Sequence, residues 1–501
     1  MKYRTISISI MIIVAIAVSL PVSMRAQSTY PIVDTNQDLC YDNQRSISCP
    51  TEGEQFYGQD SQHEGLAPAY RDNGDGTVSD LSTGLMWQKN LLDVKPDYAT
   101  AQAMADTFSL AGYDDWRLPT IKELYSLMDF TGVTGMSAQS SVPYIDTEYF
   151  DFRFGGTVIP SERFIDAQYA SDTPYKGFVF ENQPALFGLN LADGRIKGYP
   201  QTKAFEVRFV RGNPQYGIND FVDNGDGTIT DNATTLMWDK DGSSEGMNWE
   251  DALAWVQTRN AEQYKGYTDW RLPNAKELQS LLDYDRSPSE TNSAAISPLF
   301  QVPTITDEGG ETNYPFYWTS TTHEDGPTDE KAVYICFGEA LGFMEAPPGS
   351  GNYRLMDVHG AGAQRSDPKD GNPADYPNGF GPQGDVIRIF NFVRPVRDAE
   401  ATTGIDVGQS ANPEGFRVQA IYPNPASSMA IVPIELETNR VVTITLYSIT
   451  GEQMAEVTDA GLTQGSHLLR FDTSGYEAGT YFCAVRSSGA MHVQQFRVLP
   501  Q

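Results

Sequence analysis

The stretch Asp115-Trp116-Arg117-Leu118-Pro119-Thr120-Ile121-Lys122-Glu123-Leu124 decides the fold, and it recurs as Asp269-Trp270-Arg271-Leu272-Pro273-Asn274-Ala275-Lys276-Glu277-Leu278. In each copy the proline restricts the residue before it to extended conformations. Thr120 or Asn274 then occupies the N-cap position, and a glutamate three residues later completes a capping box. Apolar residues follow with helical spacing, namely Leu124, Leu127 and Met128 in the first copy and Leu278, Leu281 and Leu282 in the second. Each copy therefore predicts a strand end, which holds Arg117 or Arg271, and a short capped helix that packs one apolar face on a sheet.

Other motifs around this stretch also occur twice and in the same order. Asn-Gly-Asp-Gly-Thr lies at 73–77 and 224–228, and Leu-Met-Trp lies at 85–87 and 236–238. Phe-Val-Arg closes each copy, as Phe209-Val210-Arg211 and as Phe392-Val393-Arg394. Such ordered repetition predicts two homologous domains in tandem, at 70–212 and 221–398.

Each repeat is expected to have an α+β fold. The Asn-Gly and Asp-Gly pairs favour tight turns between antiparallel strands. Helices are predicted at 98–108 and 248–263, followed by the capped helix, and short strands make up the remainder of each repeat. The second repeat alone carries a Gly/Pro-rich segment at 344–386, which is expected to be a long, ordered loop that shapes the surface.

The segments outside the repeats indicate an exported protein. Residues 1–26 combine basic residues with a short apolar run and are typical of a signal peptide, and no other apolar run is long enough to predict a transmembrane segment. Residues 27–69 form a polar lead-in, in which Cys40 and Cys49 are expected to form a disulfide. A linker at 399–414 precedes 415–501, where alternating strands predict a small antiparallel β-sandwich.

Charge and composition limit the partners. The chain of 501 residues has a net charge of −31, so nucleic acid is not expected as a partner because an acidic surface repels polyanions. The five histidines are scattered, with no His-x-x-x-His pair, which excludes the zinc-protease pattern. No set of residues indicates catalysis, so no catalytic residue is predicted.

Three groups of side chains are candidates for ligand or metal binding. Asp357 and His359, with Arg365 and Asp385 in the same long loop, can face a ligand or can bond the loop to its domain. Among the tryptophans, Trp255 and Trp318 are the candidates for stacking on sugar rings, and the others are expected in the core. The weak calcium candidates are Asp72, Asp75, Asp223 and Asp226, for which a hairpin-turn role is the stronger interpretation because the spacing differs from an EF-hand loop. Calcium is the one cofactor that the sequence leaves open.

The ordered motifs Asn-Gly-Asp-Gly-Thr, Leu-Met-Trp, Trp-Arg-Leu-Pro and Phe-Val-Arg resemble the C-terminal domain of the Legionella collagen-like adhesin, over residues 70–398. This resemblance implies a surface adhesin that binds glycans. Arg-Leu-Pro-Thr with its following Glu is also similar to the helix start of formylglycine-generating enzymes, which implies a C-type-lectin-like fold. The chemistry of those enzymes needs a reactive cysteine pair late in the domain, where this chain has only Cys336.

The C-terminal segment resembles the sorting domain of the type IX secretion system of Bacteroidota. The motifs are Tyr422-Pro423-Asn424-Pro425, Ile449-Thr450-Gly451-Glu452 and Ala478-Gly479-Thr480-Tyr481. This resemblance implies a partner, the type IX secretion machinery, and a protein that is secreted or attached to the outer-membrane surface after signal-peptide cleavage.

Two hypotheses follow. The first is a non-catalytic, adhesin-like binding protein whose tandem lectin-like domains recognise an extracellular glycan or another surface. The alternative is an enzyme on a formylglycine-generating-enzyme-like scaffold that uses the loop at 344–386.

Overall fold

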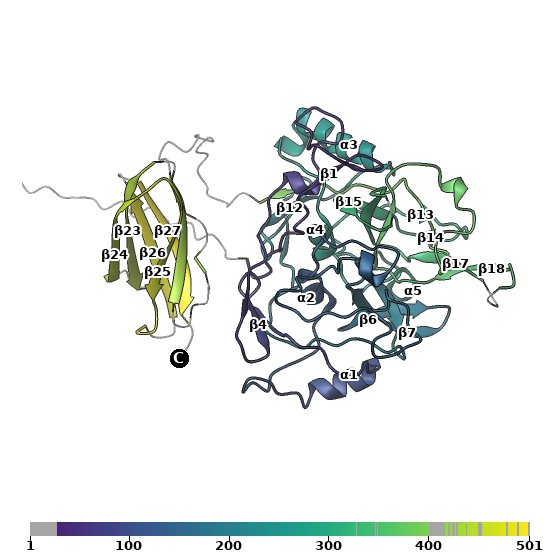
Figure 1. The fold of residues 1–501 in the computed structure, drawn as a ribbon. Helices are drawn as coiled ribbons and strands as arrows, with labels where there is room; N and C mark the ends of the chain where they lie inside the picture. Colours follow the sequence, from purple (N-terminus) through teal and green to yellow (C-terminus); the bar gives the residue numbers. More distant parts are fainter. Residues whose placement is uncertain are drawn as a thin grey trace, which may run out of the picture.

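The computed structural model describes residues 28–399, apart from 327, 346 and 348, and most of 416–498, with gaps at 419–420, 423–425, 427–428, 437, 449–452, 477–478 and 488–489. The predicted signal peptide, nearly all of the linker and most of the three sorting motifs lie outside the described residues. Among the described residues, strands account for 36% and helices for 12%, in several small antiparallel sheets. The fold is therefore rich in β-structure, with far less helix than an even α+β mixture would have (Figure 1).

Each repeat is framed by a four-stranded antiparallel sheet that joins its beginning to its end. The order is β3-β4-β5-β9 in the first repeat and β10-β11-β12-β20 in the second. The bounds are β3 Tyr70–Asp72, β4 Thr77–Asp80, β5 Leu85–Gln88 and β9 Val210–Gly212, then β10 Phe221–Asp223, β11 Thr228–Asp231, β12 Leu236–Asp239 and β20 Val396–Asp398. The Asn-Gly-Asp-Gly motif forms the first hairpin of each sheet, because Gly74 and Gly76 adopt positive φ angles of 76° and 88° there.

The helices lie between the strands of these frames. Their bounds are α1 Tyr98–Ala105, α2 Ile121–Ser126 and η2 Ala138–Ser140 in the first repeat, and α3 Trp249–Ala261, η3 Tyr264–Gly266, α4 Ala275–Ser280, α5 Pro288–Thr291 and η4 Pro373–Asp375 in the second. The Trp-Arg-Leu-Pro motif starts α2 and α4 as expected, with a full capping box at Thr120 and at Asn274. In both copies the motif's arginine forms a two-pronged ion pair with the capping glutamate, Arg117 with Glu123 and Arg271 with Glu277. The arginine thereby fixes the glutamate that caps the helix.

A six-stranded sheet in the order β15-β16-β19-β8-β7-β6 runs through both repeats. The first repeat supplies β6 Gln168–Val179, β7 Gln183–Asn190 and β8 Arg195–Pro200, and the second supplies β15 Phe316–His323, β16 Lys331–Cys336 and β19 Gln364–Pro368. The two halves meet where Gln364 on β19 pairs with Ile196 on β8. The second repeat also has two small hairpins, β13 Ile305–Thr306 with β14 Thr312–Asn313 and β17 Leu341–Glu345 with β18 Tyr353–Asp357. The segment at 344–386 is therefore partly regular, since it contributes β18, the connecting strand β19 and η4.

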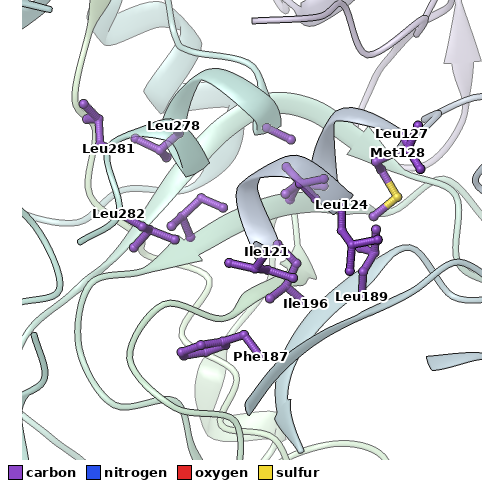
Figure 2. Packing of buried hydrophobic residues seen from close by; sticks show 14 of the residues in the cluster. Ile121, Leu124, Leu127, Met128, Phe187, Leu189, Ile196, Leu278, Leu281 and Leu282 are labelled. Carbon is purple, nitrogen blue, oxygen red and sulfur yellow. The ribbon is translucent and has the colours of Figure 1, made fainter. Parts of the chain in front are cut away.

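The capped helices α2 and α4 pack on each other between the two repeats. Figure 2 shows them next to each other over the strands that carry Phe187, Leu189 and Ile196. Lys122 on α2 donates to the carbonyl oxygen of Ser280 at the end of α4, at 2.9 Å, and Lys276 on α4 donates to that of Ser126 at the end of α2, at 3.1 Å. Both lysines are buried, and burial lowers the pKa of each to about 8. The shared sheet and this reciprocal exchange make the two repeats a single folded body.

The two closing Phe-Val-Arg motifs were expected to occupy equivalent positions in the two repeats, and this is wrong: the structure offsets them by three residues. Fully buried Arg208 donates to the carbonyl oxygens of residues 88, 89 and 151, and fully buried Arg394 donates to those of residues 239, 240 and 301. Three residues later, Arg211 pairs with Asp115 and Arg397 with Asp269. The repeated unit is therefore Val-Arg-x-Val-Arg, at 207–211 and 393–397, and each arginine serves the framework of its own repeat.

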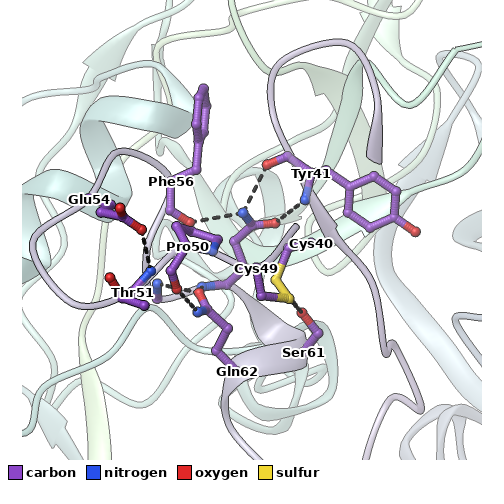
Figure 3. The surroundings of a disulfide bond; sticks show 11 residues. Cys40, Tyr41, Cys49, Pro50, Thr51, Glu54, Phe56, Ser61 and Gln62 are labelled. Atoms are coloured by element: carbon purple, nitrogen blue, oxygen red, sulfur yellow. Dashed lines mark hydrogen bonds between the residues drawn. A yellow bond between two sulfur atoms is a disulfide. The ribbon is translucent and has the colours of Figure 1, made fainter. Parts of the chain in front are cut away.

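The lead-in lies against both repeats. It contains β1 Cys40–Tyr41, β2 Ser46–Ile47 and η1 Asp60–Gln62, and Cys40 and Cys49 form a disulfide whose surroundings are shown in Figure 3. The carbonyl oxygen of Thr35 accepts from the amide of Phe130 in the first repeat, and Gln37 exchanges two hydrogen bonds with the backbone of Thr322 in the second. Residues 28–69 therefore hold the two repeats together from outside the sheet.

The C-terminal segment forms two antiparallel sheets, β21-β22-β25 and β24-β23-β26-β27. The strands are β21 Phe416–Val418, β22 Met429–Leu436, β23 Arg440–Ser448, β24 Gln453–Leu462, β25 Gly465–Asp472, β26 Gly479–Ser487 and β27 Ala490–Val498. One apolar core takes side chains from both sheets, including Val432, Leu446 and Phe496. The sheets thus face each other as a β-sandwich, and Cys483 is buried in its core.

Candidate functional site

The structure brings the four predicted polar residues of the long loop together. His359 Nε2 lies 2.8 Å from Asp385 Oδ1, and Arg365 forms an ion pair with the other oxygen of Asp385. Burial alone would raise the pKa of Asp385, but Arg365 and His359 hold it well below its usual range. Burial lowers the pKa of His359 to about 3, so its ring is neutral at pH 7. The cluster is therefore an internal ion pair with a neutral histidine beside it.

This cluster docks the second repeat onto the first. The amide of Phe180 donates to the carbonyl oxygen of Asp357 at 2.9 Å, and the amide of Gly198 donates to that of His359 at 2.6 Å. The Tyr175 hydroxyl donates to the Asp357 carboxylate at 2.7 Å. His359 is 1% exposed and Arg365 is 7% exposed, which leaves neither open to a large ligand. These residues could face a ligand or bond the loop to the rest of the protein, and their contacts fit the second role.

The two tryptophan candidates differ in exposure. Trp318 is completely buried in β15, where its Nε1 donates to the carbonyl oxygen of Met247 at 2.8 Å. Its ring has no free face for a sugar, which corrects the expectation at this residue. Trp255 on α3 is half-buried, with the Arg259 guanidinium 5.2 Å from the ring centre.

The calcium candidates serve their hairpin turns. Asp72 and Asp223 each accept from the backbone amide two residues later and each pair with a lysine, Lys89 or Lys240, at 2.5 Å. Asp75 and Asp226 accept from the backbone and hydroxyl of the threonine two residues later. Within the described ranges, no three His, Cys, Asp or Glu side chains gather as a metal site would require.

A groove in the second repeat lies next to the long loop. Its volume is about 440 Å³, within the range of small-ligand sites. It is lined by Ile305, Thr306, Glu308, Pro315, Phe316, Phe343, Pro373, Tyr376, Pro377, Val386, Ile387, Arg388, Phe390, Asn391 and Phe392. These residues come from the β13–β14 hairpin, the start of β15, β17, the η4 turn and the strand-like segment before β20. In Figure 1 the labelled hairpins β13–β14 and β17–β18 lie at the same margin of the molecule.

Stacked rings and one ion pair form the wall of the groove. Phe316 stacks on Tyr334 with ring centres 4.7 Å apart and planes at 6°. The Arg388 guanidinium lies 3.9 Å from the centre of the Phe316 ring and pairs with both oxygens of Glu308, at 2.9 and 3.0 Å. Because the planar guanidinium is fixed by stacking and by two hydrogen bonds, this wall is pre-organised.

The backbone of the groove is strained next to Arg388. Ile389 has a φ angle of 60°, which is unfavourable for a β-branched residue. The buried carboxylate of Asp367 stabilises this turn, since one of its oxygens accepts from the amides of Arg388 and Ile389 at 3.0 Å each. Burial raises the pKa of Asp367 to about 6. The strained turn joins Arg388 to Phe390, which both line the groove, and strain of this kind is often found at functional sites.

Two exposed aromatic rings lie at or near the same groove. Phe390 is 49% exposed and Phe380 is 54% exposed. Phe380 packs edge-on against Tyr376, with ring centres 6.2 Å apart, and Tyr376 lines the groove. Water-exposed aromatic rings beside an apolar groove are typical of a binding surface.

Sequence reasoning did not identify this groove. The prediction concentrated on the charged residues within 344–386, whereas the groove uses apolar residues and prolines of that segment, Phe316 and Glu308 before it, and 387–392 after it. The available signal was the density of aromatic residues and prolines at 373–392, which include Tyr376, Phe380 and Phe390. Such aromatic residues indicate a binding surface only when the structure shows that they are exposed rather than buried in the core.

Three of the solved structures that resemble the chain are weak likenesses. The C-terminal domain of wzt is 10% identical over 17% of this chain and 75% of its own, with a TM-score of 0.14. A β-glucuronidase from Parabacteroides merdae is 11% identical over 30% and 20%, with a TM-score of 0.14, and dimeric latent PorU from Porphyromonas gingivalis is 13% identical over 65% and 25%, with a TM-score of 0.17. TM-scores this low carry no argument about fold or function. Among curated proteins, none matches the chain.

Two domain families match the chain. Residues 420–498 match the secretion system C-terminal sorting domain, which indicates export by the type IX system and either attachment to the cell surface or release. In the part of the chain that the structure describes, every helix is too short or too polar to cross a bilayer. The Lcl C-terminal domain matches residues 76–211 and again 227–356, which together are more than half of the 501 residues. The chain therefore belongs to the Lcl C-terminal domain family.

Proposed function

We propose that this protein is a non-catalytic, adhesin-like binding protein that holds an extracellular glycan in the groove of its second repeat. The observation that supports it best is the groove itself, which combines a pre-organised Arg388–Glu308 pair with the exposed ring of Phe390. Aromatic rings with a few fixed polar groups are the usual composition of a small-ligand site. Export by the type IX system places such a site outside the cell, where glycans are available.

The non-catalytic part of the proposal is supported by the state of the reactive groups. His359 is buried, bonded to Asp385 and not among the residues that line the groove. Cys336 is fully buried, and burial raises the pKa of its thiol well above its usual value. A protonated, inaccessible thiol is a poor nucleophile. The proposal includes a C-type-lectin-like origin for each repeat, which the capped helix packed on a sheet supports.

Binding to immobilised glycans tests this function. The mature chain, from residue 27 to 501, is passed over a panel of polysaccharides with and without calcium, beside a Phe390→Ala variant. Phe178→Ala is the matched control, because Phe178 lies on β6 of the first repeat, outside the groove, and is 48% exposed against 49% for Phe390. Binding that Phe390→Ala weakens and Phe178→Ala leaves intact is expected. No binding to any glycan contradicts the proposal.

A further inference from the structure

The groove has no net charge of its own. Among the side chains that line it, only Glu308 and Arg388 are charged, and they pair with each other through two hydrogen bonds. Both guanidinium nitrogens in that pair are committed to Glu308, and the flat face of the group is committed to Phe316. The third guanidinium nitrogen, Nη1, has no hydrogen-bond partner, but it is itself buried. Arg388 therefore offers little accessible capacity to bind an anion.

Lys331, a cation next to the exposed Phe380 ring, is also paired. Lys331 lies 5.2 Å from the centre of the Phe380 ring, and its ammonium group bonds the Asp325 carboxylate at 2.8 Å. Asp325 in turn pairs with Arg195 of the first repeat. Beyond the groove the chain carries 66 acidic residues against 35 basic ones, so its field repels anions at long range. A sulfated or uronic polymer would meet an unfavourable field and no uncommitted cation among these groups.

The remaining groups suit hydroxyls and apolar ring faces. Glu308 has a 28% exposed side chain, and each carboxylate oxygen accepts more than one hydrogen bond, so it can accept from a ligand hydroxyl while it holds Arg388. Thr306, two residues earlier on the same hairpin, is exposed and adds a hydroxyl that both donates and accepts. Phe390 and Tyr376 supply ring faces for the apolar side of a sugar ring.

We infer that the groove binds an uncharged sugar, and that it discriminates against sulfated and uronic glycans. This inference rests on the proposed glycan-binding function and gives its ligand class. Recognition uses stacking on Phe390 and Tyr376 and hydroxyl contacts to Glu308 and Thr306, so affinity depends weakly on salt. Discrimination arises because an anionic substituent gains no ion pair and must approach an acidic molecule.

Affinity electrophoresis of the mature chain tests the inference with matched probes. Dextran and dextran sulfate share one backbone and differ in charge, and mannan and xylan extend the uncharged set. We expect retardation by at least one uncharged polysaccharide, little change between 50 and 500 mM NaCl, and at least about a tenfold loss of affinity in Phe390→Ala but not in Phe178→Ala. Glu308→Gln keeps an acceptor and should retain most of the binding.

Each other outcome has a distinct meaning. Binding to dextran sulfate but to none of the uncharged polymers, with a steep loss in salt, overturns the inference and leaves glycan binding in place. Binding to an uncharged polymer that Phe390→Ala does not weaken overturns the assignment to this groove. Failure to bind any charged or uncharged polysaccharide overturns the proposed function itself, and the inference with it.

Discussion

At the scale of single residues, Lys122 and Lys276 explain why two similar domains form one body. The side chain of each lysine extends to the last turn of the other helix and donates to a backbone carbonyl oxygen there. Such carbonyl oxygens at a helix end have no partner within the helix, so each lysine satisfies one of them. Lys122 also bonds Asn219 and Gly217 in the connection between the repeats. Two buried ammonium groups thus occupy the contact between α2 and α4.

These lysines predict an unusual pH dependence. Burial lowers the pKa of Lys122 from 10.5 to about 8, so between pH 8 and 10.5 the unfolded chain binds more protons than the folded one. The contribution of Lys122 to the free energy of unfolding therefore rises with pH across this window. Lys122→Met removes that contribution, and the stability of the wild type relative to this variant should increase from pH 8 to pH 10. All seven tryptophans lie within 70–398, so their fluorescence during urea unfolding reports on the repeats alone. The control is Lys176→Met, at an exposed site, for which no such pH dependence is expected. If the difference in the free energy of unfolding between wild type and Lys122→Met were the same at every pH, the assignment to Lys122 would be contradicted.

Asp60 predicts the opposite pH dependence of stability, in a lower pH range. It is 3% exposed, its carboxylate accepts from Thr35 and Thr321, and burial raises its pKa to about 7. Between pH 3.8 and 7 the folded chain therefore binds more protons, so stability from this group falls as the pH rises. Asp60→Asn keeps the shape without the charge, and it should gain stability relative to wild type between pH 4 and pH 7 in the same fluorescence assay. Equal pH profiles for the two proteins would count against a buried, partly protonated Asp60.

Residue-level prediction from sequence succeeded where the pattern was local. Thr120, Asn274 and their glutamates cap helices because a capping box depends on residues three apart. It failed for Trp318, whose burial depends on β15 lying inside a sheet that spans both repeats. It also misaligned the closing arginines, since the shared letters Phe-Val-Arg conceal the Val-Arg-x-Val-Arg unit that the hydrogen bonds define.

At the scale of elements, the arginine of the Trp-Arg-Leu-Pro motif belongs to the helix that follows. Glu277 is 6% exposed, completes the capping box of α4 and pairs with Arg271, so Glu277→Ala removes half of that box and takes the main partner from a guanidinium that is only 13% exposed. We expect a loss of about 3–5 kcal/mol in the free energy of unfolding. Arg163→Ala removes an exposed pair with Asp166, whose arginine is 57% exposed, and should cost less than about 1 kcal/mol. Similar small losses in both variants would show that the motif's ion pair has no special structural role.

The long segment of the second repeat shows what an element-level prediction lacks. Its Gly and Pro content indicates turns, and positive φ angles at Gly379, Gly381 and Gly384 agree with that. Strand β19 within it was not predicted, because it lies between β16 of its own repeat and β8 of the other, and a single sequence does not state which strands meet. The groove depends on the same long-range arrangement.

At the scale of the molecule, the repeats are expected to depend on each other. Separating them at residues 212–221 would expose the buried face between α2 and α4 and the edges of β8 and β19. Residues 221–399 alone should aggregate or be digested rapidly by protease, whereas 28–399 should give a protease-resistant core. Limited proteolysis of 28–399, 28–212 and 221–399 side by side measures this, and two stable, soluble halves would restore the view of two independent domains.

The most direct measurement of the central claim is a crystal structure of the protein with a bound, uncharged oligosaccharide that retards it in electrophoresis. The sugar is predicted in the second repeat's groove, with a ring against Phe390 or Tyr376 and a hydroxyl within hydrogen-bond distance of Glu308. A sugar bound at the hairpins of Asp72 and Asp223, or beside His359, with the groove of Phe316 and Arg388 free of ligand, would contradict the account.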